Sequence, residues 1–483
     1  MKKIICLLLA VLLLVSGMAL AEESETTQTQ TVDMSSYLVI LHSGELYADP
    51  QAGMGLLRAG LIRSRLEAAG ATVLLLDLGN SLYGSDTAYL DKGVGMASLM
   101  QQAGYSAVAV GEQEALLGEE SINALAAGGL KLVGQSGGYE VLELTTAAGG
   151  SLKVGMFCLK KEDANPMMSA LDSVQALEEQ SCDLIIGLCG AEQETAREVA
   201  GSVDGIDILL MSGEEPMENG EWQESGTLLA QAGAGLATLG CIVVDDQGNA
   251  TAMQLDETYF EGDTVDEAFT AKLSEVTAAQ EALLHQVIAT SAAELSGENS
   301  DAAQSVLGSW TADAVRSVTG AEMAFLTADC FGSALASGEI TCEMVMVNAF
   351  PMDKQIVTAQ MSGEEIISLL ENAIASYPEK SADFVQVSGL YFSIDPAQAA
   401  GSRVHSVMVN GQAIDPKGCY LVALNEELTN RAEQRFGKLS HLVCDYLTEQ
   451  TAVGEQTMEA RITEAVRPVE SKEPEATDAP AAN

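Results

Sequence analysis

The feature that most constrains this fold is the alternation of short apolar runs with amphipathic stretches between residues 37 and 245. Apolar runs at 37–41, 73–78 and 107–110 are separated by helical spacing at 54–70 and 93–103. Val- and Leu-rich runs that alternate with helices are typical of parallel strands buried on both faces. We therefore expect an α/β layered sandwich. The pattern continues with strands at 130–134, 139–145, 152–159, 183–188, 206–211, 227–232 and 239–245, and helices at 168–180 and 192–202.

A long helical stretch at 263–286 separates this region from a second one. We expect the first domain to cover 37–262, the stretch to be a connector helix, and an α+β domain to follow at 287–462. Residues 22–36 are polar and predict a flexible lead-in, while 463–483 are acidic and Pro-rich and predict a disordered tail.

The first 21 residues have the three parts of a secretory signal. Lys2 and Lys3 supply the positive start, residues 4–15 the apolar run, and Ala19-Leu20-Ala21 the cleavage site. The run is shorter than a bilayer span, and no later segment is long and apolar enough to cross a membrane. These features predict export with cleavage after Ala21 and a secreted, extracytoplasmic protein without a membrane span.

The charge of the chain limits its partners. Seventy acidic residues face 23 Lys and Arg, which gives a net charge of −47. A field of this sign opposes binding to a nucleic acid polymer. The ligand itself is not identified by the composition, and the oligomeric state stays open. Nine cysteines occur without a C-x-x-C pair, so zinc ribbons and thioredoxin-like chemistry have no support.

Several framework segments follow the pattern of a known family. Gly111 and Glu114 match its loop after the third strand, and the most specific match is FVQVSGL at 384–390, followed by GSRV at 401–404. In these segments the chain resembles the 5′-nucleotidase family. The resemblance implies an N-terminal metallophosphoesterase-like α/β layered sandwich, joined by a helix to a C-terminal α+β 5′-nucleotidase-type domain. It also implies nucleotide catabolism as the family's role.

The metal-binding positions implied by the resemblance carry other residue types. The family holds two metal ions with His, Asp and Asn side chains, and an additional His assists at the phosphate. Glu112 aligns with the ligating Asn, and Gln113 with the assisting His. Glu45 stands for an Asp, Tyr47 for a His and Asn80 for the bridging Asp. The remaining three ligating His positions are occupied by Gly190, Gly213 and Glu215.

The substrate-binding positions implied by the resemblance are replaced as well. Thr327 and Gly332 begin and end the run that aligns with the family's N-G-G-G-I-R, so the Arg that helps to hold phosphate is missing. Asp301 stands where the family has another Arg, and residues 426–431 lack the aromatic that stacks on the base. These changes would remove bidentate phosphate contacts and a stacking ring.

The number of histidines leads to the same conclusion without an alignment. The chain has four, and only His42 lies in the first domain, where we expect it to end a strand. A two-metal phosphoesterase needs several imidazole and carboxylate ligands that converge. One His cannot build such a site. We therefore expect no confident catalytic, metal or substrate residue at the aligned positions.

Acidic residues leave an alternative open. Glu45, Glu112, Glu214 and Glu215 would meet near Asn80 if the fold is as expected, and oxygen ligands of this kind could hold Ca²⁺ or Mg²⁺. They are equally interpreted as solvated loop acids of a very acidic protein. No other cofactor is indicated.

Three functional hypotheses follow. The first is a secreted pseudoenzyme, 5′-nucleotidase-like in fold, that acts as a binding or surface-interaction protein. The second is a metal-dependent phosphoesterase that acts on extracellular nucleotides through an altered site, so the sequence leaves open whether the chain is an enzyme. The third is a structural role in an envelope assembly.

Overall fold

The computed structural model describes residues 33–135, 138–147, 149–161, 163–257, 266–456 and 458–465. Contacts divide the chain into two compact units, Met1–Leu284 and His285–Asn483. The predicted signal sequence lies outside the described residues, as do most of the predicted lead-in and tail. None of the described helices has both the length and the apolar character that a membrane crossing would require.

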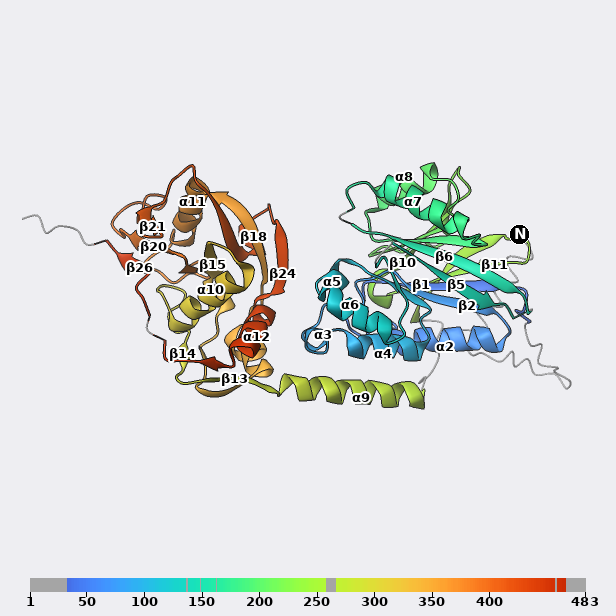
Figure 1. Ribbon diagram of the computed structural model, residues 1–483, viewed down its shortest axis with the longest axis horizontal. Coiled ribbons are helices and arrows are strands. Elements are labelled where there is room, and N and C mark those ends of the chain that lie inside the picture. Colours follow the sequence, from blue (N-terminus) through green and yellow to red (C-terminus); the bar gives the residue numbers. More distant parts are fainter. Residues whose placement is uncertain are drawn as a thin grey trace, which may run out of the picture. The chain divides into compact units, whose positions relative to one another are not determined.

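Two six-stranded sheets form the centre of unit 1 (Figure 1). Strands β1, β2, β3 and β4 of the first sheet run parallel, as do β6, β7, β8 and β10 of the second. The first sheet consists, in spatial order, of β12 (Ala250–Leu255), β11 (Leu239–Val244), β1 (Leu38–Ser43), β2 (Thr72–Asp77), β3 (Ala107–Ala109) and β4 (Leu132–Val133). The second consists of β5 (Tyr139–Thr145), β6 (Ser151–Leu159), β7 (Leu184–Cys189), β8 (Ile208–Gly213), β10 (Leu228–Gly233) and β9 (Glu221–Trp222).

Helices cover the outer faces of both sheets, as Figure 1 shows. Apolar residues from the inner faces of the two sheets, such as Ile40, Met156 and Ile186, form one core, and the helices α7 and α8 enclose a second. The predicted layered sandwich is therefore confirmed. The helices of this unit are α2 (Gly55–Ala68), α3 (Asp86–Leu90), α4 (Val94–Ala103), α5 (Glu112–Ala115), α6 (Gly118–Ala127), α7 (Pro166–Glu179), α8 (Gln193–Ser202) and α9 (Glu267–Leu284).

Helix α9 occupies most of the predicted connector. It packs against α3 and α4, and Gln280 donates a hydrogen bond to the Asp91 carboxylate over 2.7 Å. Val276 is buried in this contact. Its side chain packs so closely on Gly95 of α4 that a Cβ added there would lie 2.6 Å from it. Helix α9 is therefore part of the packed body of unit 1.

Unit 2 is built around a five-stranded and a four-stranded sheet. The first consists of β19 (Val385–Ser388), β15 (Met323–Thr327), β23 (Cys419–Asn425), β18 (Gln355–Ser362) and β24 (Gln434–Lys438), and the second of β22 (Gln412–Ala413), β21 (Val404–Val409), β20 (Leu390–Ile394) and β26 (Ile462–Glu464). The helices are α10 (Val306–Thr319), α11 (Gly363–Ala373) and α12 (Leu439–Gln450). Short strands β13 (Val287–Ser291), β14 (Leu295–Ser296), β16 (Ala334–Leu335), β17 (Gly338–Thr341) and β25 (Ala452–Val453) complete the unit.

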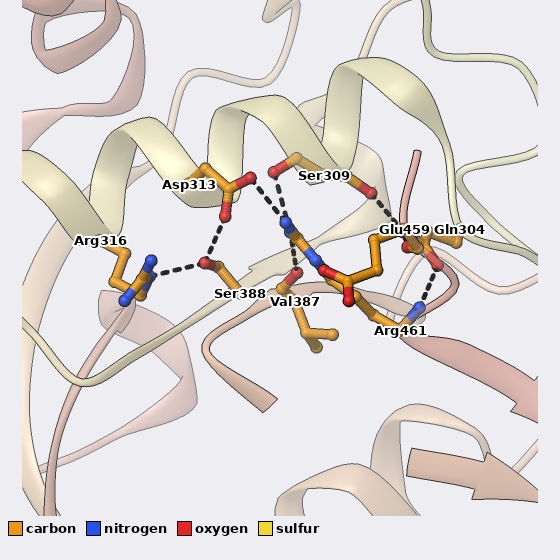
Figure 2. Close-up of polar contacts among 8 residues, drawn as sticks. All are labelled: Gln304, Ser309, Asp313, Arg316, Val387, Ser388, Glu459 and Arg461. Carbon is orange, nitrogen blue, oxygen red and sulfur yellow. Dashed lines mark hydrogen bonds and ion pairs between the residues drawn. The ribbon is translucent and has the colours of Figure 1, made fainter. Parts of the chain in front are cut away.

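A polar network connects α10, β19 and the last described segment of unit 2 (Figure 2). The Arg461 guanidinium donates to the Asp313 carboxylate at 2.6 Å and to the Val387 carbonyl at 2.9 Å. The Ser388 hydroxyl donates to the other oxygen of Asp313 at 2.6 Å and accepts from Arg316 at 2.8 Å. Ser388 belongs to the FVQVSGL segment that carries the family resemblance, so this match includes a residue of a structural network.

Ordered structure extends beyond two predicted boundaries. Met34, in the predicted flexible lead-in, is fully buried and donates its N–H to the carbonyl of Ala69 over 2.9 Å. At the other end, β26 pairs in parallel with β20 through residue Glu464, whereas the disordered tail was expected from 463. Both corrections have the same cause, since each short segment gains backbone hydrogen bonds from a neighbouring element.

Candidate functional site

A cavity of about 460 Å³ lies at the carboxyl ends of the parallel strands of unit 1. Loops after strands of both sheets contribute to it, which is the usual position of ligand sites in α/β folds. The structure brings all seven of the aligned metal positions to this cavity: Glu45, Tyr47, Asn80, Glu112, Gly190, Gly213 and Glu215. Glu214, which we expected beside them, is exposed and does not line the cavity.

The loops around the cavity adopt conformations that few side chains favour. Glu45, Tyr47 and Asn80 all have positive φ, at 60°, 48° and 56°. Backbone hydrogen bonds hold these conformations, because the Tyr47 N–H donates to the Asn80 carbonyl at 2.8 Å and the Glu45 N–H to Gly79 at 2.9 Å. Strain of this kind often accompanies a ligand site.

Glu114 fixes two of these loops. Its buried carboxylate accepts four backbone N–H groups, from Asn80, Ser81 and Leu82 at 2.8 Å and from Gly111 at 3.0 Å. Burial raises the pKa of Glu114, and these hydrogen bonds oppose the rise. Glu114, which matches the family pattern at this loop, therefore has a structural role: it holds the two loops in place.

The walls of the cavity carry charges of both signs. Glu45, Glu112 and Glu215 are joined by Glu192, and Lys160 and Lys161 supply positive charge. Burial raises the pKa of Tyr47, and the negative charges of Glu45, Glu112 and Glu114 raise it further, which places these acids in its vicinity. The lysines follow β6, a loop for which sequence reasoning named no residue.

Sequence reasoning also missed the polar wall formed by two glutamines. Gln231 is buried and donates to the Glu215 carbonyl over 2.5 Å, and Gln193 donates to the Gln231 side-chain oxygen over 3.4 Å. Gln231 lies near the carboxyl end of β10. That position was the available signal, because residues near the carboxyl ends of the parallel strands meet at the same sheet edge.

The donor set does not fit a pair of transition-metal ions. No imidazole lines the cavity, and among its described residues no three carboxylate, imidazole or thiolate groups have ligand atoms within 4.8 Å of one another. The Asn80 side-chain oxygen already accepts the Gln113 N–H at 2.9 Å. Burial raises the pKa of the Cys158 thiol, which also lines the cavity, to about 12. Without a bound cation this thiol is therefore protonated at neutral pH.

His42 does not line the cavity and is not placed to bind a metal ion there. It lies in β1 with no exposed surface, and neither ring nitrogen has a hydrogen-bond partner among the described parts of the chain. A Cβ on Gly240, in the neighbouring strand β11, would lie 2.1 Å from the imidazole Nε2. Burial lowers the pKa of His42 to about 3. It is a neutral core residue, and its position within a strand was predicted.

The predicted substrate positions of unit 2 are separated. Asp301 and Gly332 line an open cavity of about 730 Å³, but Thr327 does not. Thr327 is buried and hydrogen-bonds to Asn425 through both its N–H, at 2.8 Å, and its hydroxyl, at 3.1 Å. Asp301 forms an ion pair with Lys380 at 3.0 Å. An acid with a basic partner does not replace an arginine as a phosphate ligand.

Cysteine chemistry does not contribute to either site. Within the part of the chain that the structure describes, the eight cysteines from Cys158 to Cys444 form no disulfide. Cys189, beside one of the replaced His positions, is buried, and burial raises its pKa to about 11. A thiol held protonated in this way is a structural residue rather than a nucleophile.

The chain is similar to known proteins in both sequence and structure. Residues 287–436 match the family described as 5′-nucleotidase, C-terminal domain. A curated relative, the trifunctional nucleotide phosphoesterase protein YfkN of Bacillus subtilis, is 24% identical over 311 residues, which are 56% of this chain. The chain spans about a fifth of that relative, because the aligned part is 21% of its length.

Solved structures extend the likeness to most of the chain. The NAD nucleotidase of Haemophilus influenzae superposes with a TM-score of 0.68 at 15% identity, covering 89% of this chain and 99% of that one. A 5′-nucleotidase precursor from Thermus thermophilus has 21% identity and a TM-score of 0.48, with 89% and 100% covered. At such identities the superposition shows the fold. The family match itself covers residues 287–436, the part of the chain that matches the 5′-nucleotidase C-terminal domain.

Proposed function

We propose that this chain is a 5′-nucleotidase-like binding protein that does not catalyse metal-dependent phosphate hydrolysis. The observation that carries the proposal is the cavity at the carboxyl ends of the strands. It has kept its shape-determining loops, while its walls present carboxylates, amides and two lysines in place of converging imidazoles. The mixed charges would suit a polar ligand, which enters from solvent and meets hydrogen-bonding groups on several loops.

Hydrolysis assays test this proposal. The protein should be incubated with AMP, a UDP-sugar and a generic phosphate ester in the presence of Mn²⁺, Mg²⁺, Ca²⁺ or Zn²⁺. We expect no turnover above the buffer rate, and no difference between the wild type and Glu112→Ala. Metal-dependent turnover that Glu112→Ala abolishes would overturn the proposal and favour the alternative below.

The alternative is a phosphoesterase that acts on extracellular nucleotides. It is favoured by the name of the curated relative and by four glutamates that share the cavity with Asn80. Oxygen ligands of this kind could hold Ca²⁺ or Mg²⁺. Calorimetric titration with Ca²⁺ separates the two, because saturable heat that disappears in Glu45→Gln and Glu112→Gln would support a cation site.

We further propose that the chain is exported and cleaved after Ala21. The support is the sequence of residues 1–21, with two lysines followed by a short apolar run. N-terminal sequencing of the protein recovered outside the cytoplasm tests this, and Glu22 is the expected first residue. An uncleaved Met1 in that fraction would contradict it.

A further inference from the structure

A second cavity of unit 1, of about 610 Å³, lies at the opposite ends of the same strands. Its lining includes Leu38 and Thr72 at the starts of β1 and β2, and Leu184 and Ile208 at the starts of β7 and β8. The space therefore opens between the two sheets at their amino edge. It shares no residue with the cavity described above.

The inner walls of this second cavity are apolar. They continue the core between the sheets, whose partly buried members at this end include Leu38, Leu152, Leu184, Val244 and Ala250. Core residues are normally covered, because each exposed apolar group costs free energy. A recess of this volume at the end of a core is of the size that accommodates a small molecule.

Aromatic rings stand at the cavity. Trp222, at the end of the short strand β9, is 56% exposed, and Tyr37, which precedes β1, is half-buried. Because Trp222 is exposed and lines an apolar recess, its ring is placed to contact a ligand that binds there. Its ring face offers the quadrupole that attracts organic cations.

The charged groups of the lining all have one sign. Among the residues that the structure describes, four aspartates line the cavity (Asp183, Asp207, Asp245 and Asp246), and no lysine, arginine or histidine does. Asp183 and Asp207 each use one oxygen to accept a backbone N–H at 2.8 Å, from Lys153 and Ile185. The Lys153 ammonium is directed elsewhere, to the Gln180 carbonyl at 2.7 Å. Among the described residues, no hydrogen bond occupies the second oxygen of either carboxylate, so both oxygens are available to a ligand.

We propose that this second cavity binds an organic cation with an apolar body, such as an aryl- or alkylammonium compound. The apolar walls would take the body, and the Trp222 ring and the Asp183 and Asp207 carboxylates would take the charge. Charge complementarity also decides against the lead-in of this chain as the occupant. Residues 22–32 carry Glu22, Glu23 and Glu25 and no basic residue.

Tryptophan fluorescence gives a direct test, because the chain has only two tryptophans. Trp310 lies in unit 2 and is 7% exposed, and Trp310→Phe leaves Trp222 as the only reporter. The probes are benzyltrimethylammonium, neutral benzyl alcohol and anionic benzoate, titrated at physiological salt and followed in parallel by calorimetry. We expect saturable one-to-one binding of the cation, at least tenfold weaker binding of the alcohol, and none of benzoate.

Matched variants separate a built site from the general attraction of an acidic protein. Asp183→Asn with Asp207→Asn keeps both backbone acceptors, and should weaken cation binding by roughly tenfold or more. Asp204→Asn changes the charge on a nearby exposed residue that does not line the cavity, and should leave the affinity unchanged. Circular dichroism verifies that each variant is folded.

Three results would overturn the proposal. The first is the absence of saturable binding by either method. The second is an equal loss of affinity in Asp204→Asn and in the double variant, which would mean non-specific attraction. The third is binding that appears only after deletion of residues 22–32, since the lead-in would then be the occupant.

Discussion

The backbone N–H of Gln113 donates a hydrogen bond to the side-chain oxygen of Asn80 over 2.9 Å. Two positions that the family uses for chemistry are thereby joined to each other. Asn80 also needs its positive φ of 56°, which Asn tolerates better than most residues. We predict that Asn80→Ala destabilises unit 1 by about 1–2 kcal/mol, through the lost hydrogen bond and the strained backbone.

Urea unfolding measures this effect if each unit is followed separately. Trp222 reports on unit 1 in a Trp310→Phe background, and Trp310 reports on unit 2 in a Trp222→Phe background. Asn372→Ala, at an exposed position of α11, is the control and should change little. An Asn80→Ala protein as stable as its parent would show that the bond to Gln113 carries no weight.

Glu114 gives a larger expected effect. Its carboxylate accepts four backbone N–H groups from two loops and is buried. Glu114→Ala would leave those donors without their acceptor and should cost unit 1 about 3 kcal/mol or more. Glu119→Ala, an exposed acid on α6, serves as the comparison in the same Trp222 assay. Equal stability of the two variants would contradict the framework role.

We predict that the buried carboxyl group of Asp77 makes the stability of unit 1 depend on pH. Burial raises its pKa from 3.8 to about 7, against hydrogen bonds from Ser43, Ser81 and Gly79 that lower it. The folded state therefore retains a proton that the unfolded state loses, so this group makes unit 1 less stable as pH rises from about 4 to 7. Above pH 7 the contribution is constant. Each unit of pKa difference corresponds to about 1.4 kcal/mol.

Asp77→Asn should remove that contribution. The stability of the variant relative to wild type is expected to increase steadily from pH 4 to pH 7, when both are measured by urea unfolding. His42, with a pKa lowered by burial to about 3, acts in the opposite direction as pH falls below 6.5, but it is present in both proteins. A difference between the two that does not vary with pH would refute the assignment.

The ion pair between Arg461 and Asp313 connects the last described segment to α10. The Arg461 side chain is 13% exposed and Asp313 42%, so solvent screens the pair. A double-mutant cycle with Arg461→Met and Asp313→Asn should give a coupling energy of about 0.5–1.5 kcal/mol. Arg461→Met alone should cost more, because two carbonyls and the carboxylate lose a donor.

The Trp310 signal measures this cycle, and limited proteolysis reports on the terminal segment. Arg435→Met, which removes the exposed pair with Glu426, is the control. Additive effects of the two changes would show that the pair does not couple α10 to the terminal segment.

The layered arrangement of unit 1 could be predicted because its buried strands differ sharply in composition from the helices between them. Val73 to Leu76 is a continuous apolar run, and β2 covers Thr72–Asp77. The alternation of apolar and amphipathic segments does not predict the elements that are short or half-exposed. The segment after Val110 was expected to be a loop as far as Gly118, but it contains α5, held by the Glu114 carboxylate, and α6 starts at Gly118. Strands β12, β19 and β24 and helix α12 were not predicted, because tertiary pairing decides such segments.

The candidate site was predictable in position but not in content. Residues that follow parallel strands must meet at one sheet edge, and Glu45, Asn80 and Glu112 do. Lys160 and Gln193 could not be foreseen, since nothing in their local sequence distinguishes them from surface residues. Asp77 was overlooked because an acid at the end of an apolar run does not reveal that it will be fully buried.

In the described part of the chain, the walls of the first cavity lack the ligands for a pair of catalytic metal ions. The metal content of the purified chain tests this, measured by inductively coupled plasma mass spectrometry after equilibration with Mn²⁺ and Zn²⁺ and dialysis against metal-free buffer. We expect far less than one ion per chain, unchanged by Glu45→Gln with Glu112→Gln. Two retained ions per chain, lost in that double variant, would refute the proposed loss of the metal site.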